Sequence, residues 1–350
     1  MENQTQPRNM TTLCYIEQDN KYLMLHRIKK KQDVNAGKWI GVGGHLEPGE
    51  SPEDCVKREV LEETGLMLTA YKFCGLVTFT QYGYGTEYMS LFTADGFTGT
   101  LAEDCNEGVL TWIPKDEIGT LNLWEGDSIF LRLLVERDDF FSLKLEYDED
   151  TLVKAELDGE LLEFFDLLDE DGHKTGQKKP RMFVHADGDY HATSHTWLVR
   201  KMEKGQTTFP NYEILLQKRS ADKDAFPGCY DISSAGHIPA GGEYLSSARR
   251  ELREELGIIM PEEAFTLIGA HDDEVDTIFY GKRFWNHELS NVYVVDVTGQ
   301  KLEFSLQTEE VESVRWMPYE EVTKALETGS IPHCIAMDEW KLLGEYLSRS

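Results

Sequence analysis

Short runs of alternating hydrophobic and polar residues follow one another along the first half of the chain. A period of two is typical of half-buried β-strands, and it predicts strands at residues 71–80 and 88–94, while the strand-like runs at residues 11–16 and 22–25 predict two more. Two other stretches, residues 52–64 and 128–135, place hydrophobic residues at helical spacing instead. The first half is therefore expected to combine a sheet with a few helices, in the α/β class.

The second half repeats this order of elements, and its strands are predicted at residues 195–200, 213–217 and 291–297. The landmarks keep a constant separation, since Arg219 stands as far from Arg27 as Arg250 stands from Arg58. Solenoid repeats have periods of about 20–50 residues. A repeat at this much larger separation indicates a duplicated domain.

The duplication sets the expected domain organisation. We expect one domain at residues 1–158 and a second at residues 159–350. Trp112 and Trp316, which close the two copies, are further apart than the other landmark pairs. The second copy therefore contains an insertion, which we place in a loop at residues 272–287.

A cluster of carboxylates occurs once in each half, at residues 44–66 (GHLEPGESPEDCVKREVLEETGL) and 236–258 (GHIPAGGEYLSSARRELREELGI). In the first copy Glu59, Glu62 and Glu63 have the i, i+3, i+4 spacing that puts them on one helix face. Carboxylates this close repel one another unless a cation lies between them. Mg²⁺ or Mn²⁺ takes oxygen ligands of this kind, so we expect a divalent cation as cofactor.

The glycine-rich loop before this helix is expected to add a ligand, the backbone carbonyl of Gly43. A divalent ion can acidify water and stabilise charge on a bridging oxygen, so the cluster predicts phosphate chemistry. In the second copy the corresponding residues are Arg250, Glu251, Glu254 and Glu255.

The composition of the chain limits which kinds of molecule it is expected to bind and where in the cell it is expected to act. The net charge of −29 argues against an extended nucleic-acid surface, which needs clustered Lys and Arg. No apolar run approaches the roughly 18 residues of a membrane span, and the N-terminal sequence lacks an export-signal pattern. Six scattered cysteines without a CxxC pair are typical of reduced thiols. We expect a cytoplasmic protein that acts on small molecules, does not bind membranes and is a candidate homo-oligomer.

The pattern G-x5-E-x7-R-E-U-x-E-E-x-G-U, where U is a bulky aliphatic residue, resembles the Nudix box. The first copy fills every fixed place, with Gly44, Glu50, Arg58, Glu59, Val60, Glu62, Glu63, Gly65 and Leu66. The resemblance implies an α/β/α sandwich around a mixed sheet in each domain. It also implies Mg²⁺- or Mn²⁺-dependent hydrolysis of nucleoside diphosphates linked to another group.

The same resemblance assigns roles to residues. Glu59 and Glu63 would be metal ligands, Glu62 a ligand or a residue that positions water, and Arg58 would orient the glutamates. Glu107 matches an additional metal-binding glutamate of the MutT-like branch. Water is expected to attack phosphorus while a glutamate accepts its proton. This assigns catalysis to Glu62, Glu63 and Arg58, and in the second copy to Glu254, Glu255 and Arg250.

The first domain is also similar to bacterial 8-oxo-dGTP diphosphatases, through residues 38–44 and 124–128. In related purine-triphosphate enzymes, a Trp and acidic residues of the second segment hold the oxidised base. Trp124 and Asp127 match these roles, because an indole stacks on a purine and a carboxyl can bind its N–H edge.

Arg27 and Lys38 are further expected substrate contacts. Two positions depart from the vertebrate enzyme's pattern: Gly126 replaces a second acid, and Ile40 replaces an Asn that contacts the base. Because of these departures, the sequence does not predict which base the site accepts. The prediction of pyrophosphohydrolysis is unchanged.

The second domain departs from the box at Gly242, which stands where the first Glu belongs. Its surroundings resemble the isopentenyl-diphosphate-isomerase-like branch. By that resemblance His191, His237 and Glu310 match metal ligands, whereas Ala235 stands where an isomerase has its catalytic Cys.

Two alternatives stay open for the second domain. His185, His191, His195 and His237 either form a second metal site or bond locally at strand ends. The leading functional hypothesis is a tandem hydrolase whose second domain cleaves an unknown diphosphate. One alternative is a ligand-sensing module without turnover. The other is a prenyl-diphosphate isomerase, against which the absence of the Cys argues.

Overall fold

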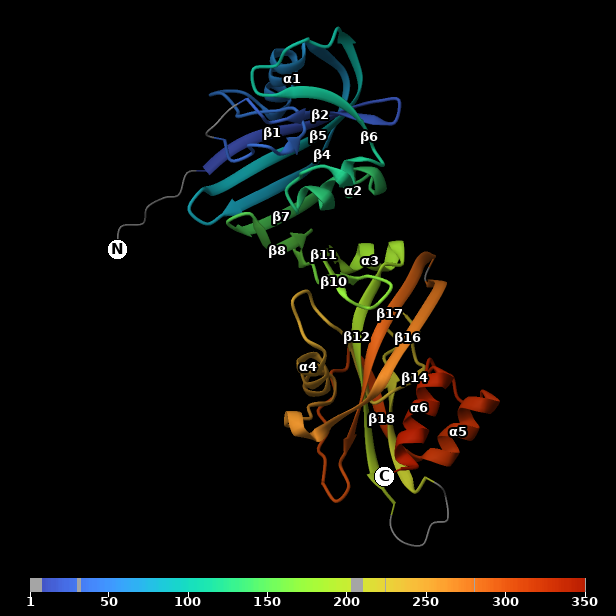
Figure 1. Ribbon diagram of the computed structural model, residues 1–350. Helices are drawn as coiled ribbons and strands as arrows, with labels where there is room; N and C mark the ends of the chain where they lie inside the picture. Colours follow the sequence, from blue (N-terminus) through green and yellow to red (C-terminus); the bar gives the residue numbers. More distant parts are fainter. Residues whose placement is uncertain (1–7, 30–32, 203–209, 224, 280, 350) are drawn as a thin grey trace, which may run out of the picture. The chain divides into compact units, whose positions relative to one another are not determined.

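A computed structural model describes residues 8–29, 33–202, 210–223, 225–279 and 281–349. The chain divides into two units, Met1–Leu162 and Glu163–Ser350 (Figure 1). The expected domain boundary, between residues 158 and 159, falls in the turn that precedes the last strand of the first unit.

The first unit is built on one mixed sheet in the order β3-β2-β1-β5-β4-β7-β8-β9, with β6 also paired to β2. β1 runs parallel to β5 and β4 runs parallel to β7, whereas the other neighbours are antiparallel. The strands are β1 (Arg8–Gln18), β2 (Lys21–His26), β3 (Trp39–Ile40), β4 (Leu66–Gln81), β5 (Gly85–Gly99), β6 (Val109–Pro114), β7 (Phe141–Asp148), β8 (Thr151–Leu157) and β9 (Glu160–Leu161).

Two helices cover opposite faces of this sheet, α1 (Pro52–Thr64) and α2 (Asp127–Glu136). Cys14 and Ile16 of β1 pack with Val56 of α1 in one buried cluster. Tyr15 points to the other face of β1, where its ring centroid lies 6.1 Å from that of Phe130 in α2. A short 3-10 helix, η1 (Ile118–Thr120), precedes α2.

The second unit is organised around β12, which pairs with β10, β13, β15 and β17. β11 pairs with β10, β14 and β18 pair with β13, and β16 forms a long hairpin with β17. β12 and β17 are parallel, so this sheet is also mixed. The strands are β10 (Phe164–Leu168), β11 (Lys174–Pro180), β12 (Tyr190–Lys201), β13 (Tyr212–Arg219), β14 (Tyr230–Asp231), β15 (Ser234–His237), β16 (Phe265–Phe279), β17 (Lys282–Asp296) and β18 (Val311–Pro318).

Helices again lie on both faces of the sheet, with α4 on one side and α5 and α6 on the other (Figure 1). Leu198 of β12 packs with Leu252 of α4, whereas its neighbour Trp197 packs with Val322 of α5 and Trp340 of α6. The helices are α3 (Arg181–Asp187), α4 (Tyr244–Leu256), α5 (Tyr319–Thr328) and α6 (Met337–Leu347). The expected fold class is confirmed: each unit is an α/β/α sandwich with a mixed sheet. Among the described residues, no helix reaches the length and apolarity of a membrane span.

The ends of α1 follow from local sequence. The hydroxyl of Ser51 accepts from the backbone N–H of Asp54 at 3.1 Å, and the Asp54 carboxylate accepts from the N–H of Ser51 at 3.2 Å. This capping box satisfies two helix-end donors. Gly65 ends the helix with φ of 73°, a left-handed conformation that glycine adopts without strain. α4 ends in the same way at Gly257, but its N-cap, Glu243, makes no side-chain capping bond.

The insertion in the second copy is not where the sequence placed it. Residues 272–279 lie in β16 and residues 282–287 in β17, and this hairpin corresponds to that of β4 and β5. The additional residues lie between α4 and β16, where the 3-10 helix η2 (Glu262–Ala264) occurs, and between β17 and β18. The prediction was wrong because three exposed carboxylates, Asp272, Glu274 and Asp276, interrupt the hydrophobic alternation expected of a half-buried strand.

Candidate functional site

The first carboxylate cluster forms where α1 passes the glycine loop that precedes it. A Cβ on Gly44 would overlap the carboxylate of Glu59, so a side chain here would displace that carboxylate. The backbone N–H of Gly43 donates to Oε2 of Glu63 at 3.3 Å. Glu63 is 8% exposed. The fold thus brings Gly43, Glu59 and Glu63 together, with two carboxylates pressed against backbone.

Arg58 ties the acidic residues of this cluster to one another. Its guanidinium donates to both carboxylate oxygens of Glu50, at 2.7 and 2.9 Å. It also donates to Glu59 at 2.8 Å and to Glu62 at 3.3 Å. The hydrogen bonds from Arg58 lower the pKa of Glu50 to about 2. The side chain of Glu62 is 61% exposed, so it lies at the outer edge of the cluster.

Glu107 lies in the loop before β6 and pairs with Arg27. Nε of Arg27 also donates to Asp33 at 2.8 Å, and the Arg27 side chain is only 11% exposed. Burial and the charge of Glu63 raise the pKa of Cys105, which places this loop beside the α1 cluster. Glu107 is therefore near the other expected ligands, but Arg27 is held between two carboxylates.

Trp124 is buried in a cage of side chains and is 5% exposed. Its indole N–H donates to Oδ1 of Asn35 at 2.8 Å. The rings of Phe79 and Tyr147 meet it edge-on, with centroids 5.7 and 5.4 Å away. Nζ of Lys38 lies 4.8 Å from the centroid of the indole ring. A base that stacked on the face covered by Lys38 would have to displace that side chain.

Asp127, the first residue of α2, is 7% exposed. Burial raises the pKa of Asp127 to about 7, although a backbone hydrogen bond at Trp124 and the charge of Lys38 act in the opposite direction. Such a carboxyl exchanges its proton near neutral pH. It can therefore accept or donate a hydrogen bond.

The second cluster repeats the geometry of the first on α4. A Cβ on Gly236 would overlap the carboxylate of Glu251. Arg250 pairs with Glu251 at 2.7 Å and with Glu254 at 3.1 Å, and it donates to the carbonyl of His237 at 3.2 Å. Burial raises the pKa of Glu251 to about 7, against the charge of Arg250.

Glu255 is the most enclosed carboxylate of the second cluster, at 5% exposure. Burial raises the pKa of Glu255 to about 8, and the charge of Glu251 adds to the rise. Its Oε2 has no hydrogen-bond partner in the part of the chain that the structure describes. A buried polar atom in that state favours a ligand such as a cation.

Gly242 makes the second cluster looser than the first. Among the described residues, Glu251 and Glu254 are the carboxylates paired with Arg250, so none takes the place of Glu50, and the side chain of Arg250 is 33% exposed against 23% for Arg58. A Cβ on Gly242 would come within 2.8 Å of the carbonyl oxygen of Pro239. Restoring a glutamate at this position would therefore require the loop to move.

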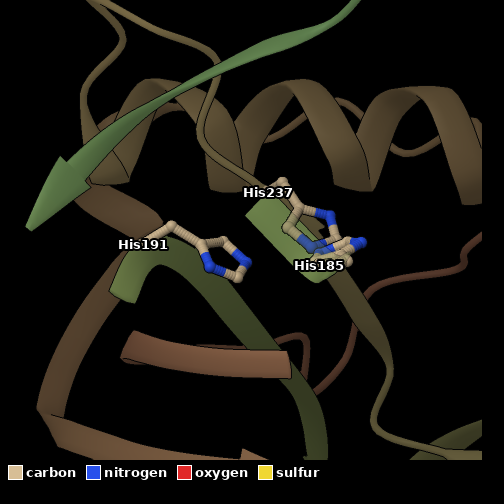
Figure 2. Close-up of side chains that lie close together, drawn as sticks. All are labelled: His185, His191 and His237. Atoms are coloured by element: carbon tan, nitrogen blue, oxygen red, sulfur yellow. The ribbon is translucent and has the colours of Figure 1, made fainter. Parts of the chain in front are cut away.

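Three histidines from three different elements converge beside this cluster: His185 of α3, His191 of β12 and His237 of β15 (Figure 2). One ring nitrogen of each lies within 4.8 Å of the other two. Nδ1 of His191 lies 2.9 Å from the carbonyl oxygen of Asp189, which leaves Nε2 for another partner. Among the described residues, none of the three Nε2 atoms has a hydrogen-bond partner. We call these three residues the histidine triad.

The triad is kept in the neutral form that binds metals. Burial lowers the pKa of His185 to about 3 and lowers the pKa of His191 and of His237 below their ordinary value. Phe165 stacks on His191 and His237, with centroids 5.3 and 4.6 Å away. This apolar wall excludes water from one side of the triad.

His195, the fourth histidine considered for this group, lies elsewhere. Its Nδ1 is 2.8 Å from Oε2 of Glu339, and its Nε2 is 3.7 Å from Oε1 of Glu288. Burial alone would lower the pKa of His195, but the charges of Glu339 and Glu288 raise it well above its ordinary value. Burial would likewise raise the pKa of Glu288, but His195 holds it at about 2. His195 is therefore a buried imidazolium between two carboxylates.

Glu310, an expected ligand, pairs with Lys223. Burial and the charge of Arg219 lower the pKa of Lys223, and the charge of Glu255 raises it, so this pair lies near the α4 cluster. Glu310 thus corresponds to Glu107: each loop glutamate is held by a basic side chain.

Sequence reasoning missed Glu288, Glu339 and Lys223. Glu339 and Lys223 belong to no sequence motif. Only their burial in the folded chain marks them as candidate functional residues. Glu288 directly follows the segment that was assigned to a loop. The structure makes Glu288 the register partner of His191, and the local sequence does not contain that register.

The comparison with family models matches the NUDIX domain twice, at residues 7–134 and 198–335. The chain belongs to the Nudix family. As a family, Nudix hydrolases break phosphoanhydride bonds of small molecules and use divalent metal ions.

Named relatives cover parts of this Nudix protein. Nudix hydrolase 3 of Arabidopsis thaliana is 48% identical over 161 residues, which are 45% of this chain but only 20% of the plant protein. The oxidized purine nucleoside triphosphate hydrolase of Mus musculus is 35% identical over 130 residues, 37% of this chain and 82% of the mouse protein. A solved structure, the mutator MutT protein from Bacillus halodurans, has 27% identity and a TM-score of 0.39, and the match covers 43% of this chain and 99% of that one.

Proposed function

We propose that both Nudix domains, residues 1–158 and 159–350, hydrolyse phosphoanhydride bonds with a divalent cation, Mg²⁺ or Mn²⁺. The observation that carries the proposal is a pair of enclosed glutamates in each unit. Glu59 and Glu63 face the glycine loop before α1, and Glu251 and Glu255 take the same places on α4. Carboxylates buried so close together are stabilised when a cation joins them.

In the first domain the cation would be held by Glu59, Glu63 and the Gly43 carbonyl, with Glu107 as a further ligand once Arg27 releases it. A divalent ion there supplies acidified water and neutralises phosphate charge. Glu62 is more exposed than the ligands Glu59 and Glu63, and it contacts Arg58. This position suits Glu62 to accept the proton of the attacking water.

The substrate that the first domain fits best is a nucleoside triphosphate, with 8-oxo-dGTP as the candidate and a monophosphate and pyrophosphate as products. Asp127 supports this choice, because its near-neutral pKa lets it bind either an N–H or a carbonyl of a base edge. Trp124 and Lys38, which contact each other, would line the base site beside Asp127. Arg27 would contact the phosphates. The name of the mouse relative, an oxidized purine nucleoside triphosphate hydrolase, points the same way.

The test uses the full chain with the second domain silenced by Glu255→Gln. In that background Glu63→Gln should reduce Mg²⁺-dependent pyrophosphate release from 8-oxo-dGTP by about 100-fold or more, a loss of about 2.7 kcal/mol of transition-state stabilisation. Glu53→Gln is the matched control, because Glu53 lies in the first turn of the same helix. Turnover that survives Glu63→Gln would refute the assignment.

For the second domain we propose a diphosphate substrate of unknown identity and two kinds of metal ligand. Glu251, Glu254 and Glu255 supply oxygens, with Glu310 beside them. His191 and His237 supply imidazole nitrogens, and His185 joins them. The three unpartnered Nε2 atoms support this assignment. Ala235 offers no thiol, so prenyl-diphosphate isomerisation is not part of the proposal.

A second candidate for this domain is a sensing module that binds its ligand without turnover. The looser hold on Arg250 that follows from Gly242 favours it. Full-length Glu63→Gln protein separates the two, because any remaining phosphate or pyrophosphate release then comes from the second domain. Release from a panel of nucleotides and diphosphates, abolished by Glu255→Gln, indicates an enzyme. Saturable binding of a panel member without release indicates a sensor.

A further inference from the structure

One face of β12 carries a row of polar side chains that leads away from the histidine triad. His191, Thr193, His195 and Trp197 occupy alternate positions of the strand and therefore share a face. The parallel neighbour β17 runs beside this row, with Glu288 level with His191 and Ser290 level with Thr193.

Contacts join this row from Thr193 to Trp197. The hydroxyls of Thr193 and Ser290 lie 2.6 Å apart, and Ser290 lies 3.3 Å from Nε2 of His195. Nδ1 of His195 reaches Glu339 at 2.8 Å, and the indole N–H of Trp197 donates to the other oxygen of Glu339 at 2.7 Å. Glu339 belongs to α6, so the row connects the C-terminal helix to the strands that hold the triad.

His195 also faces Glu288, whose Oε1 lies 3.7 Å from its Nε2. The carboxylate of Glu288 and the ring of His191 influence each other electrostatically. His195 thus stands between Glu288, beside the triad, and Glu339, on α6. Around it lie Asp273 and the pair of His271 with Asp338, which are 3.3 Å apart.

Stability alone does not account for this arrangement. Glu339 is 2% exposed, and burying an ion pair costs roughly as much desolvation energy as its attraction returns. Well-packed apolar residues would dock α6 against the sheet at least as well. What a fully bonded buried network does provide is fixed side-chain geometry.

We propose that His195 is a positioning residue of the second site. Held by Glu339, it fixes the carboxylate of Glu288 beside the histidine triad and so couples helix α6 to metal binding there. This inference rests on the proposed function of the triad as a metal site. It assigns α6 a role in the site although the helix contributes no ligand of its own.

The test is a titration of the metal-free full chain with Co²⁺, followed through its visible absorption, which reports the geometry of the ligands. The triad's band is the part of the spectrum that His191→Ala removes. Glu339→Gln keeps the shape of the side chain but not its charge, and it should weaken Co²⁺ binding at the triad by about 10-fold or more. Glu345→Gln, on the same helix with a side chain 67% exposed, should leave affinity and band unchanged.

Unaltered Co²⁺ affinity and spectrum in Glu339→Gln would overturn the inference. If that variant does not fold, His195→Gln is read in its place by the same criteria. The thermal midpoint is recorded for each variant, because a merely structural role would move the midpoint without moving the band.

Failure of the metal proposal gives a different result: wild-type protein then shows no band that His191→Ala removes. In that case ring ¹⁵N spectra of the metal-free protein decide. The positioning role stands if Glu339→Gln shifts the His191 signals, and it falls if only the His195 signals move.

Discussion

At the scale of single residues, burial changes what a carboxyl group does. Asp127 has almost no contact with solvent, and its pKa rises to about 7. The pKa of Glu50, whose carboxylate is held by Arg58 at the protein surface, shifts the other way, to about 2. Two acids of one domain therefore differ in charge state across the physiological range, and only the buried one titrates near neutrality.

Asp127 should make stability fall as pH rises. Folding raises the pKa of Asp127, so above about pH 4 the folded chain retains a proton that the unfolded chain has released. The unfolding free energy therefore falls as the pH rises from about 4 to the folded pKa of about 7, and above that pH this contribution is gone. Asp127→Asn removes this loss. Relative to wild type, the variant should gain about 2–3 kcal/mol of unfolding free energy between pH 5 and pH 8, measured by denaturant unfolding.

Glu125→Gln is the control, since Glu125 is an exposed acid two positions earlier. It should leave the pH profile unchanged. A profile for Asp127→Asn that runs parallel to wild type would show that Asp127 does not titrate in this range.

The residues that sequence could assign are those whose partners are local. Glu59 and Glu63 lie on one helix, and their spacing alone predicts that they share a face. His195 and Glu339 are 144 positions apart, and nothing in the sequence near either residue indicates the other. The same limit applies to Lys223 and Glu310, which meet because β13 pairs with β18.

At the scale of elements, the two copies of the acidic helix differ in how they begin. α1 starts with a capping box between Ser51 and Asp54, whereas α4 starts at Glu243 without one. Both helices end at a left-handed glycine. The sequence was sufficient to place α1 because caps and breakers lie next to the residues they affect.

Removing the cap should destabilise the first unit. Ser51→Ala deletes the acceptor for the N–H of Asp54, and it should lower the unfolding free energy by about 1 kcal/mol. Glu243→Ser should raise that of the second unit by up to about 1 kcal/mol, because it supplies the missing acceptor. Thermal unfolding of each variant against wild type measures both effects, and equal midpoints for Ser51→Ala and wild type would contradict the role of the cap.

The hairpin of β16 and β17 shows where prediction of elements failed. Its strands are long, but much of β16 is exposed and rich in acidic residues, so the alternation that identifies half-buried strands is absent. The strand exists because β17 supplies a continuous ladder of backbone partners. That information is not contained in the local sequence.

At the scale of the whole molecule, the chain is two complete sandwiches joined in series. Each unit has its own mixed sheet, its own buried clusters and its own carboxylate site. The order of β1, β2, α1, β4, β5, β6 and α2 corresponds to that of β12, β13, α4, β16, β17, β18 and α5.

Fragments 1–162 and 163–350 should therefore fold separately. Each should show a cooperative thermal transition by circular dichroism, and the first alone should retain pyrophosphate release from 8-oxo-dGTP. The first fragment with Glu63→Gln serves as the inactive control. A fragment that lacks a cooperative transition would show that the units depend on each other for stability.

The three imidazoles beside α4 have a consequence for the organism that makes this protein. Carboxylate oxygens suit magnesium and manganese, whereas imidazole nitrogens suit zinc, iron and related ions. Under the proposed assignments, a cell starved of zinc and iron would leave the histidine triad empty, whereas the carboxylate clusters of both halves would still bind magnesium. A single polypeptide would then depend on two separate metal supplies.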